Sequence, residues 1–294
     1  MNSIMVNKMG DAYQDGIVAT LHNFQTKSLE DIEAELKLFS GYRPMELVLP
    51  CLYSELEGPA LRHIVEEISK VDYLNHVIIG LDRADEAQYR AAHSFFQNLK
   101  QPFSLLWNDG PRIQNIHSQL VERGLAPTEP GKGRNVWYCI GFANARGKAE
   151  AIALHDCDIL TYDRSLLARL FYPIANPNYQ FEFCKGYYAR VADGKMNGRV
   201  SRLLLAPLLI AMERVLGRND YLDFLRSFRY PLAGEFSFRR SLIPELRIPS
   251  DWGLEVGILS EMHRNQASNR ICQVNIADTY FQLSYQQHLD LLKL

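Results

Sequence analysis

Two aspartates spaced two residues apart, Asp156 and Asp158, carry the most obvious chemistry in this sequence. They stand in "HDCDILTYD", directly after the apolar-leaning run Ala149–Leu154. Side chains two positions apart in a turn that follows a strand can converge on one point. Such carboxylates suit a divalent-metal site, a phosphoryl-transfer site or an acid/base pair. The alternative is a plain loop, because Asp-x-Asp occurs by chance in many proteins.

Two further segments could hold an anion. "PGKGRN" places Lys132 between glycines before a predicted helix, where the amine and backbone N–H groups can face phosphate oxygens. "NGRVSR" opens another helix with Arg199, Ser201 and Arg202. A surface loop and a solvated first helical turn are the respective alternatives. Neither G-x-x-x-x-G-K-[ST] nor a G-x-G-x-x-G after the first strand is present.

Other common catalytic patterns are missing. There is no G-x-S-x-G for a serine hydrolase and no H-E-x-x-H for a zinc hydrolase. The five cysteines are scattered without a C-x-x-C pair, which argues against a disulfide framework and against a zinc ribbon. Glu235 and Glu255 stand among apolar and small residues, where they could contact sugar hydroxyls or serve as ordinary capping or salt-bridge residues.

The composition limits the class of protein. The 294 residues suffice for one large or two modest domains, and 47% are hydrophobic. A net charge of -2 gives no reason to expect a nucleic-acid partner. The longest apolar run, Leu203–Met212, contains Pro207 and is shorter than the ~20 residues of a membrane span, so we expect a buried helix there. Without an apolar signal core, a cytoplasmic protein that does not enter a membrane is expected.

The elements that must position these residues alternate along the first half. Strands are expected at 45–50, 75–82 and 103–107, with Pro50 stopping the first of them, and helices at 27–42, 58–71, 85–99 and 113–124. This order predicts a parallel sheet whose ligands lie beyond the carboxyl ends of its strands, where acidic residues recur. The second half is expected to hold two strands within 178–195, one long helix over 198–217, a loop and helix over 229–246, a helix over 251–265 and a strand over 270–278.

Seven motifs in one order resemble a known family. They are a strand ending L-P-x-x-x-x-E, "PGKG" with Trp137 five residues after Lys132, "DCDILTYD", "GRVSRLLLAPLL", "PLAGEF", "GLEVGIL" and "QVN". The chain thereby resembles the glucosyl-3-phosphoglycerate synthases, retaining glycosyltransferases with the GT-A fold. The resemblance implies an α/β fold with a Rossmann-like, mostly parallel sheet flanked by helices, and an elaborated C-terminal acceptor-binding half. We expect a single domain over 1–294, with a nucleotide-sugar half at about 45–160 and an acceptor half at about 161–294.

The resemblance also implies an activity and roles for individual residues. Glucose would pass from UDP-glucose to the 2-hydroxyl of 3-phosphoglycerate with retention, with Mg²⁺ or Mn²⁺ as cofactor, in a homodimer. Asp158 would ligate the metal and Leu232 would face the transferred sugar. Glu255 would bind the hydroxyls of that sugar or, as the alternative, act as the carboxylate nucleophile of a retaining mechanism. The donor would contact Pro50, Leu52, Glu55, Asp82, Lys132 and Asp156. The acceptor would contact Gly198, Arg199 and Ser201.

The chain departs from this pattern at its C-terminal end. The family usually follows "QVN" with a basic stretch whose histidine completes the metal site, whereas here His288 is the only downstream histidine and its spacing differs. Three alternatives stay open. They are GDP-mannose-dependent mannosyl transfer, a catalytically impaired protein that binds nucleotide sugars, and a nucleotidyltransferase, although the last would need a glycine-rich phosphate loop after the first strand.

Overall fold

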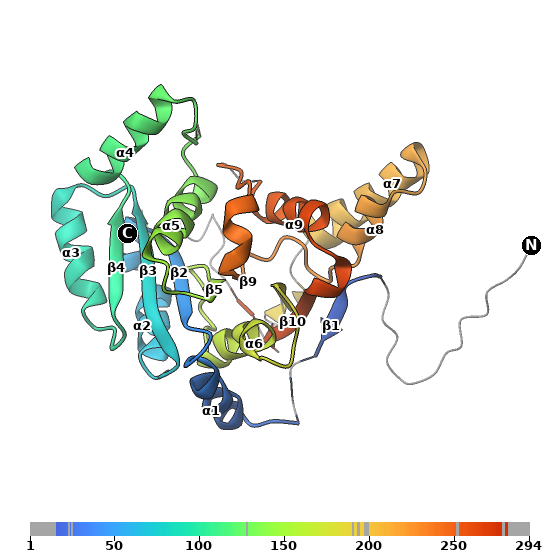
Figure 1. The fold of residues 1–294 in the computed structure, drawn as a ribbon, viewed down its shortest axis with the longest axis horizontal. Helices are drawn as coiled ribbons and strands as arrows, with labels where there is room; N and C mark the ends of the chain where they lie inside the picture. The colour runs from blue at the N-terminus through green and yellow to red at the C-terminus, as the bar shows by residue number, and fades with distance from the viewer. Residues whose placement is uncertain are drawn as a thin grey trace, which may run out of the picture.

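One mixed sheet with helices on both faces forms the body of the protein (Figure 1). The computed structural model describes residues 16–22, 24, 26–127, 129–189, 191–192, 195–196, 200–250, 253–277 and 280–281. The sheet has the strand order β1-β10-β6-β9-β5-β2-β3-β4. Neighbouring strands are parallel except for β9, which is antiparallel to β5 and to β6. The predicted α/β class with a mostly parallel sheet is confirmed.

The strands have the following bounds. They are β1 (Ala19–Leu21), β2 (Met45–Leu52), β3 (Leu74–Asp82), β4 (Phe103–Trp107), β5 (Ala151–Leu154), β6 (Phe183–Tyr188), β9 (Phe236–Arg239) and β10 (Ile271–Ala277), with a separate antiparallel pair, β7 (Val191–Ala192) and β8 (Lys195–Met196). The α-helices are α1 (Leu29–Phe39), α2 (Pro59–Ile68), α3 (Glu86–Phe96), α4 (Pro111–Glu122), α5 (Lys132–Arg146), α6 (Arg164–Ala175), α7 (Ala206–Leu216), α8 (Asp220–Arg226) and α9 (Leu254–Asn265).

Side chains of the central strands alternate between two hydrophobic clusters. Leu47 and Leu49 of β2 pack in the cluster that includes α1, α2 and α6, whereas Val48 packs in the cluster that includes α5 and α9. This alternation is the period of a strand that is buried on both faces. The helical layers on the two faces therefore fix the direction in which each strand end points.

The chain reverses its direction of sheet growth between β2 and β5. From β2 it adds β3 and then β4 on one side, and it later places β5 on the other side of β2. The crevice beyond the carboxyl ends of two such strands is the usual ligand site of an open α/β sheet. Residues after β2 and after β5 must therefore face the same crevice.

Local signals fixed several helix ends as predicted. Ser28 is the N-cap of α1, and its side chain accepts a hydrogen bond from the Asp31 backbone N–H at 3.1 Å. Gly124 follows α4 with a φ of 66°, in the left-handed region that glycine tolerates best. These ends depend on neighbouring residues alone, which is why the sequence predicted them.

The sequence predicts that Pro50 stops the first strand, but this prediction is wrong, because β2 continues to Leu52. Proline lacks the N–H that a sheet ladder requires. The pairing of β2 with β5 ends at Val48, so beyond that residue β2 has a strand only on its β3 side. Pro50 pairs with Gly80 of β3 and is tolerated at this local edge.

The expectation of a loop and helix over 229–246 is wrong in part. Residues 236–239 form β9, and only a 3₁₀ helix, Arg240–Glu245, follows it. Four residues with "FSFR" alternation are too short to distinguish from a helical start. Pairing with β5 and β6, both distant in sequence, determines this strand.

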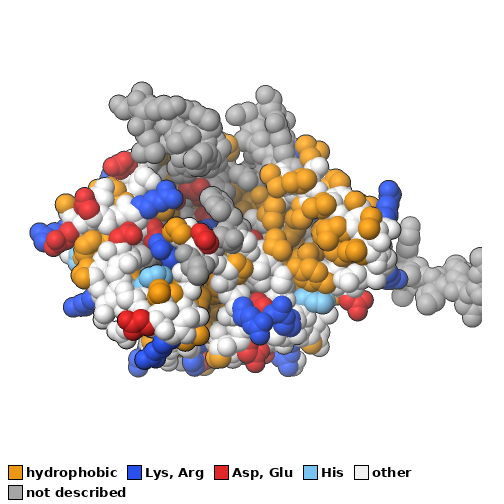
Figure 2. Space-filling view, turned by 90° about the horizontal axis from the view of Figure 1, so that it is seen from above, with side chains coloured by type: hydrophobic (Ala, Val, Ile, Leu, Met, Phe, Trp, Pro, Cys, Tyr) orange, Lys and Arg blue, Asp and Glu red, His pale blue; other side chains and the backbone are white. Residues whose placement is uncertain are grey.

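The apolar run around Pro207 is not the buried helix that the sequence predicts. A π-helical segment, Val200–Leu205, precedes α7, and Pro207 stands in the first turn of α7. Leu209 is buried, but most of the apolar side chains here are exposed. They define the α7 apolar face: Val200, Leu203, Leu204, Leu208, Ile210, Met212, Val215 and Leu216. Figure 2 shows hydrophobic side chains gathered on this side of the molecule.

None of the helices in the described part of the chain has the length and apolar character needed to cross a membrane.

Candidate active site

The side chains of the turn after β5 alternate between buried and half-buried positions. His155 and Cys157 are buried, whereas Asp156 and Asp158 are half-buried. Burial lowers the pKa of His155 to about 3, so its imidazole is neutral. The two aspartates are therefore less buried than their neighbours, and the cysteine between them packs inward.

Lys132 joins the carboxylates of two distant segments. Its Nζ lies 2.5 Å from Asp156 Oδ1 and 3.1 Å from Glu255 Oε1. Lys132 begins α5, Asp156 follows β5 and Glu255 stands in the first turn of α9. Burial alone would lower the pKa of Lys132, but the two carboxylates raise it above its ordinary value. The structure thus brings together three of the residues that the resemblance assigns to one site.

Gly234 of the "PLAGEF" segment lies against this group. A Cβ atom at this position would be 2.4 Å from Asp156 Oδ2. The carboxylate cannot withdraw without disturbing its ion pair with Lys132. Only glycine therefore allows the loop to approach Asp156 this closely.

Gly234→Ala should lower activity by on the order of 100-fold, because a shift of about 1 Å in a reacting group can cost that much. Gly141→Ala in α5 is the matched control, since its Cβ would meet nothing within 4 Å. Steady-state kinetics and thermal melts of both variants would check this. Full activity in Gly234→Ala would contradict the close approach of the loop to Asp156.

Glu235 is a fully buried carboxyl behind the ion pairs. Its Oε1 accepts a hydrogen bond from the Tyr280 hydroxyl at 2.6 Å, and its Oε2 accepts one from the Tyr188 hydroxyl at 2.9 Å. The two tyrosine rings stack with centroids 3.5 Å apart. The buried ammonium of Lys185 donates to the Ala233 carbonyl in the same loop, and burial lowers its pKa to about 8. These contacts hold the loop that precedes β9 in place.

The stability of the protein should depend on pH through Glu235. Burial, with the Asp156 charge as the next cause, raises the pKa of Glu235 from 4.5 to about 7. The folded state then binds the proton more tightly than the unfolded state, so the free energy of unfolding should fall as pH rises between those two values. Urea unfolding of the wild type and of Glu235→Gln across this range would test it. An equal decline in both proteins would contradict the assignment.

The other residues that the resemblance assigns to nucleotide-sugar binding lie at the ends of β2 and β3. The Leu52 backbone N–H donates to Glu55 Oε2 at 2.8 Å, which fixes the carboxylate beside the strand end. Asp82 is buried, and burial raises its pKa. It accepts a hydrogen bond from Asn108 Nδ2 at 2.8 Å. Pro50 of β2 is the register partner of Gly80 on the neighbouring strand β3.

A second site candidate is a cavity of 720 Å³ beside the "PLAGEF" segment. Four arginines line it, Arg202, Arg218, Arg226 and Arg229, with Asp223 as the acidic member of the lining. Ser201 also lines it, and among the described residues its buried Oγ has no hydrogen-bond partner. Such a lining suits a small anion with phosphate or carboxylate groups.

The cavity borders the loop that carries Leu232, since Tyr230 and Pro231 belong to its lining and Leu232 follows them. Leu232 itself is half-buried. Tyr188 lines the cavity as well and donates to Glu235, so one side chain joins the cavity to the loop. Gly198, Arg199 and His288 lie outside the described residues.

Sequence reasoning missed Lys185 and the two tyrosines that hold Glu235. A lysine inside the strand "FCKGYY" was the available signal, because a charged residue among buried strand positions requires a partner. Tyr188 gave no signal, since aromatic residues in strands are usual, and Tyr280 lies beyond the end of β10 without a pattern around it. Their role depends on the approach of residue 280 to residue 235, which the sequence does not show.

Comparisons with known proteins agree with this geometry. The chain is 48% identical over 272 residues to a glucosyl-3-phosphoglycerate synthase of Persephonella marina, covering 92% of this chain and 67% of that protein. It is 38% identical over 280 residues to a protein of the same name from Methanococcoides burtonii, covering 94% and 68%. No protein-family model matches the chain.

Solved structures share the fold at lower identity. A glucosyl-3-phosphoglycerate synthase of Mycobacterium tuberculosis in complex with phosphoglyceric acid matches with a TM-score of 0.65 and 20% identity, covering 94% of this chain and 82% of that one. A second structure of the same enzyme, with Mn²⁺, UDP and glucosyl-3-phosphoglycerate, matches with the same TM-score, identity and coverage. The predicted GT-A fold is confirmed.

Proposed function

This chain belongs to the glucosyl-3-phosphoglycerate synthase family, and we propose that it transfers glucose from UDP-glucose to the 2-hydroxyl of 3-phosphoglycerate with retention. The two relatives named glucosyl-3-phosphoglycerate synthase, 48% and 38% identical to this chain, support this activity. The observation that carries it is the pairing of Lys132 with Asp156 and Glu255 at the reversal point of the sheet, beside an arginine-lined cavity. The group of Lys132, Asp156 and Glu255 suits a nucleotide sugar, and the arginine-lined cavity suits a phosphorylated acid.

The donor occupies the crevice at the ends of β2, β3 and β5. Pro50, Leu52 and Glu55 hold the uracil and ribose, with Asp82 nearby, and Asp156 contacts the ribose. Lys132 brings positive charge to the diphosphate while it keeps Asp156 and Glu255 in position. These contacts belong to the half of the chain at about 45–160, apart from Glu255.

Asp158 suits a hard divalent cation. Mg²⁺ and Mn²⁺ prefer carboxylate oxygens and keep coordination sites for phosphate oxygens. Asp158 offers such oxygens from a half-buried position in the turn after β5, two residues beyond Asp156, which pairs with Lys132. A bound cation would supply Lewis-acid stabilisation of the departing diphosphate.

The acceptor occupies the cavity in the half of the chain at about 161–294. Its arginines bind the phosphate and carboxylate of 3-phosphoglycerate, with Gly198 and Arg199 contributing from outside the described residues. Ser201 Oγ, which has no partner within the described part of the chain, donates to the acceptor. This orientation directs the 2-hydroxyl at the anomeric carbon past Leu232.

Glu255 binds the hydroxyls of the sugar rather than attacking it. Its pairing with Lys132 at 3.1 Å holds the carboxylate in place and reduces its nucleophilicity. Retention then follows from attack by the acceptor on the face that the leaving group departs from. The bond from the acceptor oxygen to the anomeric carbon forms as the bond to UDP breaks, and the hydroxyl proton passes to the departing diphosphate.

A donor screen with 3-phosphoglycerate tests the proposal. UDP-glucose with Mg²⁺ or Mn²⁺ should give the fastest release of nucleoside diphosphate, and EDTA should abolish it. Faster turnover of GDP-mannose than of UDP-glucose would show that the transferred sugar is mannose. Calorimetric binding of UDP-glucose without any product would identify a binding protein instead.

We also propose that the protein is a homodimer that covers the α7 apolar face. Leu208→Lys should shift it toward the monomer, because large exposed apolar patches usually mark interfaces. Leu208 is 46% exposed, and Val121 of α4, 56% exposed and away from that face, provides the control Val121→Lys. Sedimentation velocity would measure the change. A wild-type monomer, or equal effects of both variants, would contradict the assignment.

A further inference from the structure

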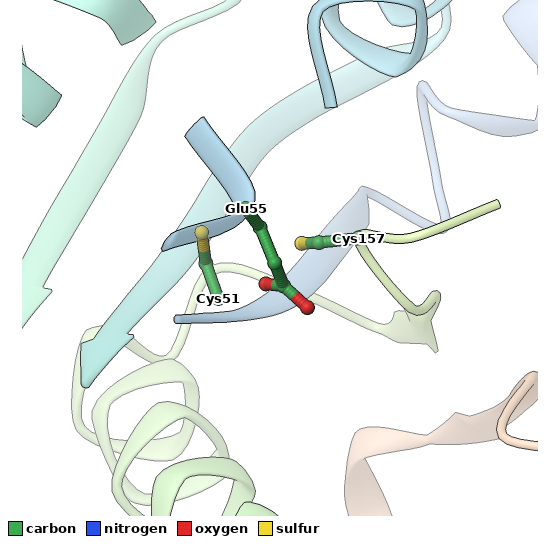
Figure 3. Close-up of side chains that lie close together, drawn as sticks. All are labelled: Cys51, Glu55 and Cys157. Atoms are coloured by element: carbon green, nitrogen blue, oxygen red, sulfur yellow. The ribbon is translucent and has the colours of Figure 1, made fainter. Parts of the chain in front are cut away.

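Two cysteines and a glutamate converge beside the reversal point of the sheet. One ligand atom from each of Cys51, Cys157 and Glu55 lies within 4.8 Å of the other two (Figure 3). Within the described part of the chain, this is the one group of three or more His, Cys, Asp or Glu side chains close enough to share a metal ion. Both cysteines are 1% exposed, and Glu55 is half-buried.

The sheet register accounts for this arrangement. Val48 of β2 is paired with Leu154 of β5. Three residues further along each segment, Cys51 and Cys157 take equivalent positions, and both pack in the same hydrophobic cluster. Glu55 comes from the 3₁₀ turn Tyr53–Glu57 that follows β2. In Figure 3 its side chain reaches toward the space between the two sulfurs.

We propose that Cys51, Cys157 and Glu55 bind a thiophilic divalent cation such as Zn²⁺, and that the occupied site excludes the nucleotide-sugar donor. Cysteine sulfurs and carboxylate oxygens are both zinc ligands, and three protein ligands leave a fourth tetrahedral position open. A site for Mg²⁺ would consist of oxygen ligands instead. This site is therefore chemically distinct from Asp158, although both lie at the end of β5.

Exclusion of the donor follows from the position of Glu55, and this part of the inference rests on the proposed function. The Leu52 N–H now fixes one carboxylate oxygen of Glu55 toward the strand end. A cation held by the two thiolates would draw the carboxylate inward, away from the ribose. Binding converts two thiols to thiolates and releases two protons to solvent.

A second cysteine pair provides the control. Cys184 of β6 is the register partner of Cys272 of β10, and both are fully buried. No carboxylate joins them in a ligand group among the described residues. Substitution there perturbs a similar buried thiol pair and leaves the proposed site intact.

Cd²⁺ titration of the reduced, metal-free protein tests the site without any substrate. The ultraviolet thiolate-to-Cd²⁺ charge-transfer band should saturate at one equivalent, and Zn²⁺ should displace it. Cys157→Ser and, independently, Cys51→Ser should weaken binding by at least the ~10–100-fold that outer-shell substitutions cost. Cys184→Ser should titrate like the wild type. Absence of the band in the wild type, or its loss in Cys184→Ser but not in folded Cys157→Ser or Cys51→Ser, would overturn the proposal.

Calorimetry with UDP-glucose tests the exclusion. One equivalent of Zn²⁺ should weaken UDP-glucose binding at least about 10-fold in the wild type and leave it unchanged in Cys157→Ser. A Cd²⁺ band combined with Zn²⁺-independent donor binding would overturn the exclusion and keep the cation site. No UDP-glucose binding even without Zn²⁺ would overturn the donor function itself, which the Cd²⁺ readout does not require.

Discussion

Asp158→Ala should lower sugar transfer by about 10³-fold while the protein stays folded. Lewis-acid stabilisation by a metal ion contributes several kcal/mol, and each ~1.4 kcal/mol corresponds to a tenfold rate. Asp158 is half-buried in a turn, so its removal leaves no large cavity. Activity against Mn²⁺ concentration, with circular dichroism of both proteins, would measure the effect.

Asp72→Ala is a suitable control for this substitution. Asp72 pairs with Lys37 at the surface, away from the crevice, and its side chain is 59% exposed. Exposed ion pairs contribute little to stability, so this variant should keep its activity and its Mn²⁺ dependence. Wild-type turnover in Asp158→Ala would exclude Asp158 as the metal ligand.

Lys132→Gln should be the second most damaging substitution, with a loss of on the order of 10²–10³ in kcat/KM, comparable to removing one donor that stabilises a developing anion. The change also leaves Asp156 and Glu255 facing each other without their shared cation. Mutual repulsion should displace both carboxylates, which raises KM for the donor and lowers kcat together.

The stability of Lys132→Gln should fall as well, by about 2–3 kcal/mol, somewhat less than the ~3–5 kcal/mol for breaking a fully buried pair, since these side chains keep some exposure. Lys148→Gln is a control at a residue for which no ion pair is described. Denaturant unfolding together with kinetics separates the two effects. A Lys132→Gln variant with lower stability but normal kinetics would make Lys132 a structural residue only.

Sequence patterns were sufficient for most elements of the first half of the fold, although not for β1 or the end of β2. Apolar runs bounded by turn residues predicted β3 and β4 nearly to the residue. They were insufficient for β9, whose four residues become a strand only through pairing with β5 and β6. The prediction of a buried helix at α7 was wrong for a different reason. The composition of this segment suits a buried helix, but packing in this chain covers only Leu209.

The candidate site depended on the order of motifs rather than on local chemistry. Lys132 and Glu255 are 123 residues apart, and no periodicity relates them. The Asp-x-Asp spacing predicted that Asp156 and Asp158 converge on one point, and both are half-buried in the turn after β5. The contacts that tie Glu235 to Tyr188 and Tyr280 needed the three-dimensional fold, because each partner comes from a different segment.

In the reaction that we propose, this chain makes glucosyl-3-phosphoglycerate from UDP-glucose and 3-phosphoglycerate. The most direct measurement is NMR of that reaction with Mg²⁺, followed to completion. We expect equal amounts of UDP and of a product whose α-glucosidic bond joins the anomeric carbon to the 2-hydroxyl of the acceptor. Unchanged UDP-glucose, or its hydrolysis to free glucose with 3-phosphoglycerate intact, would contradict the claim.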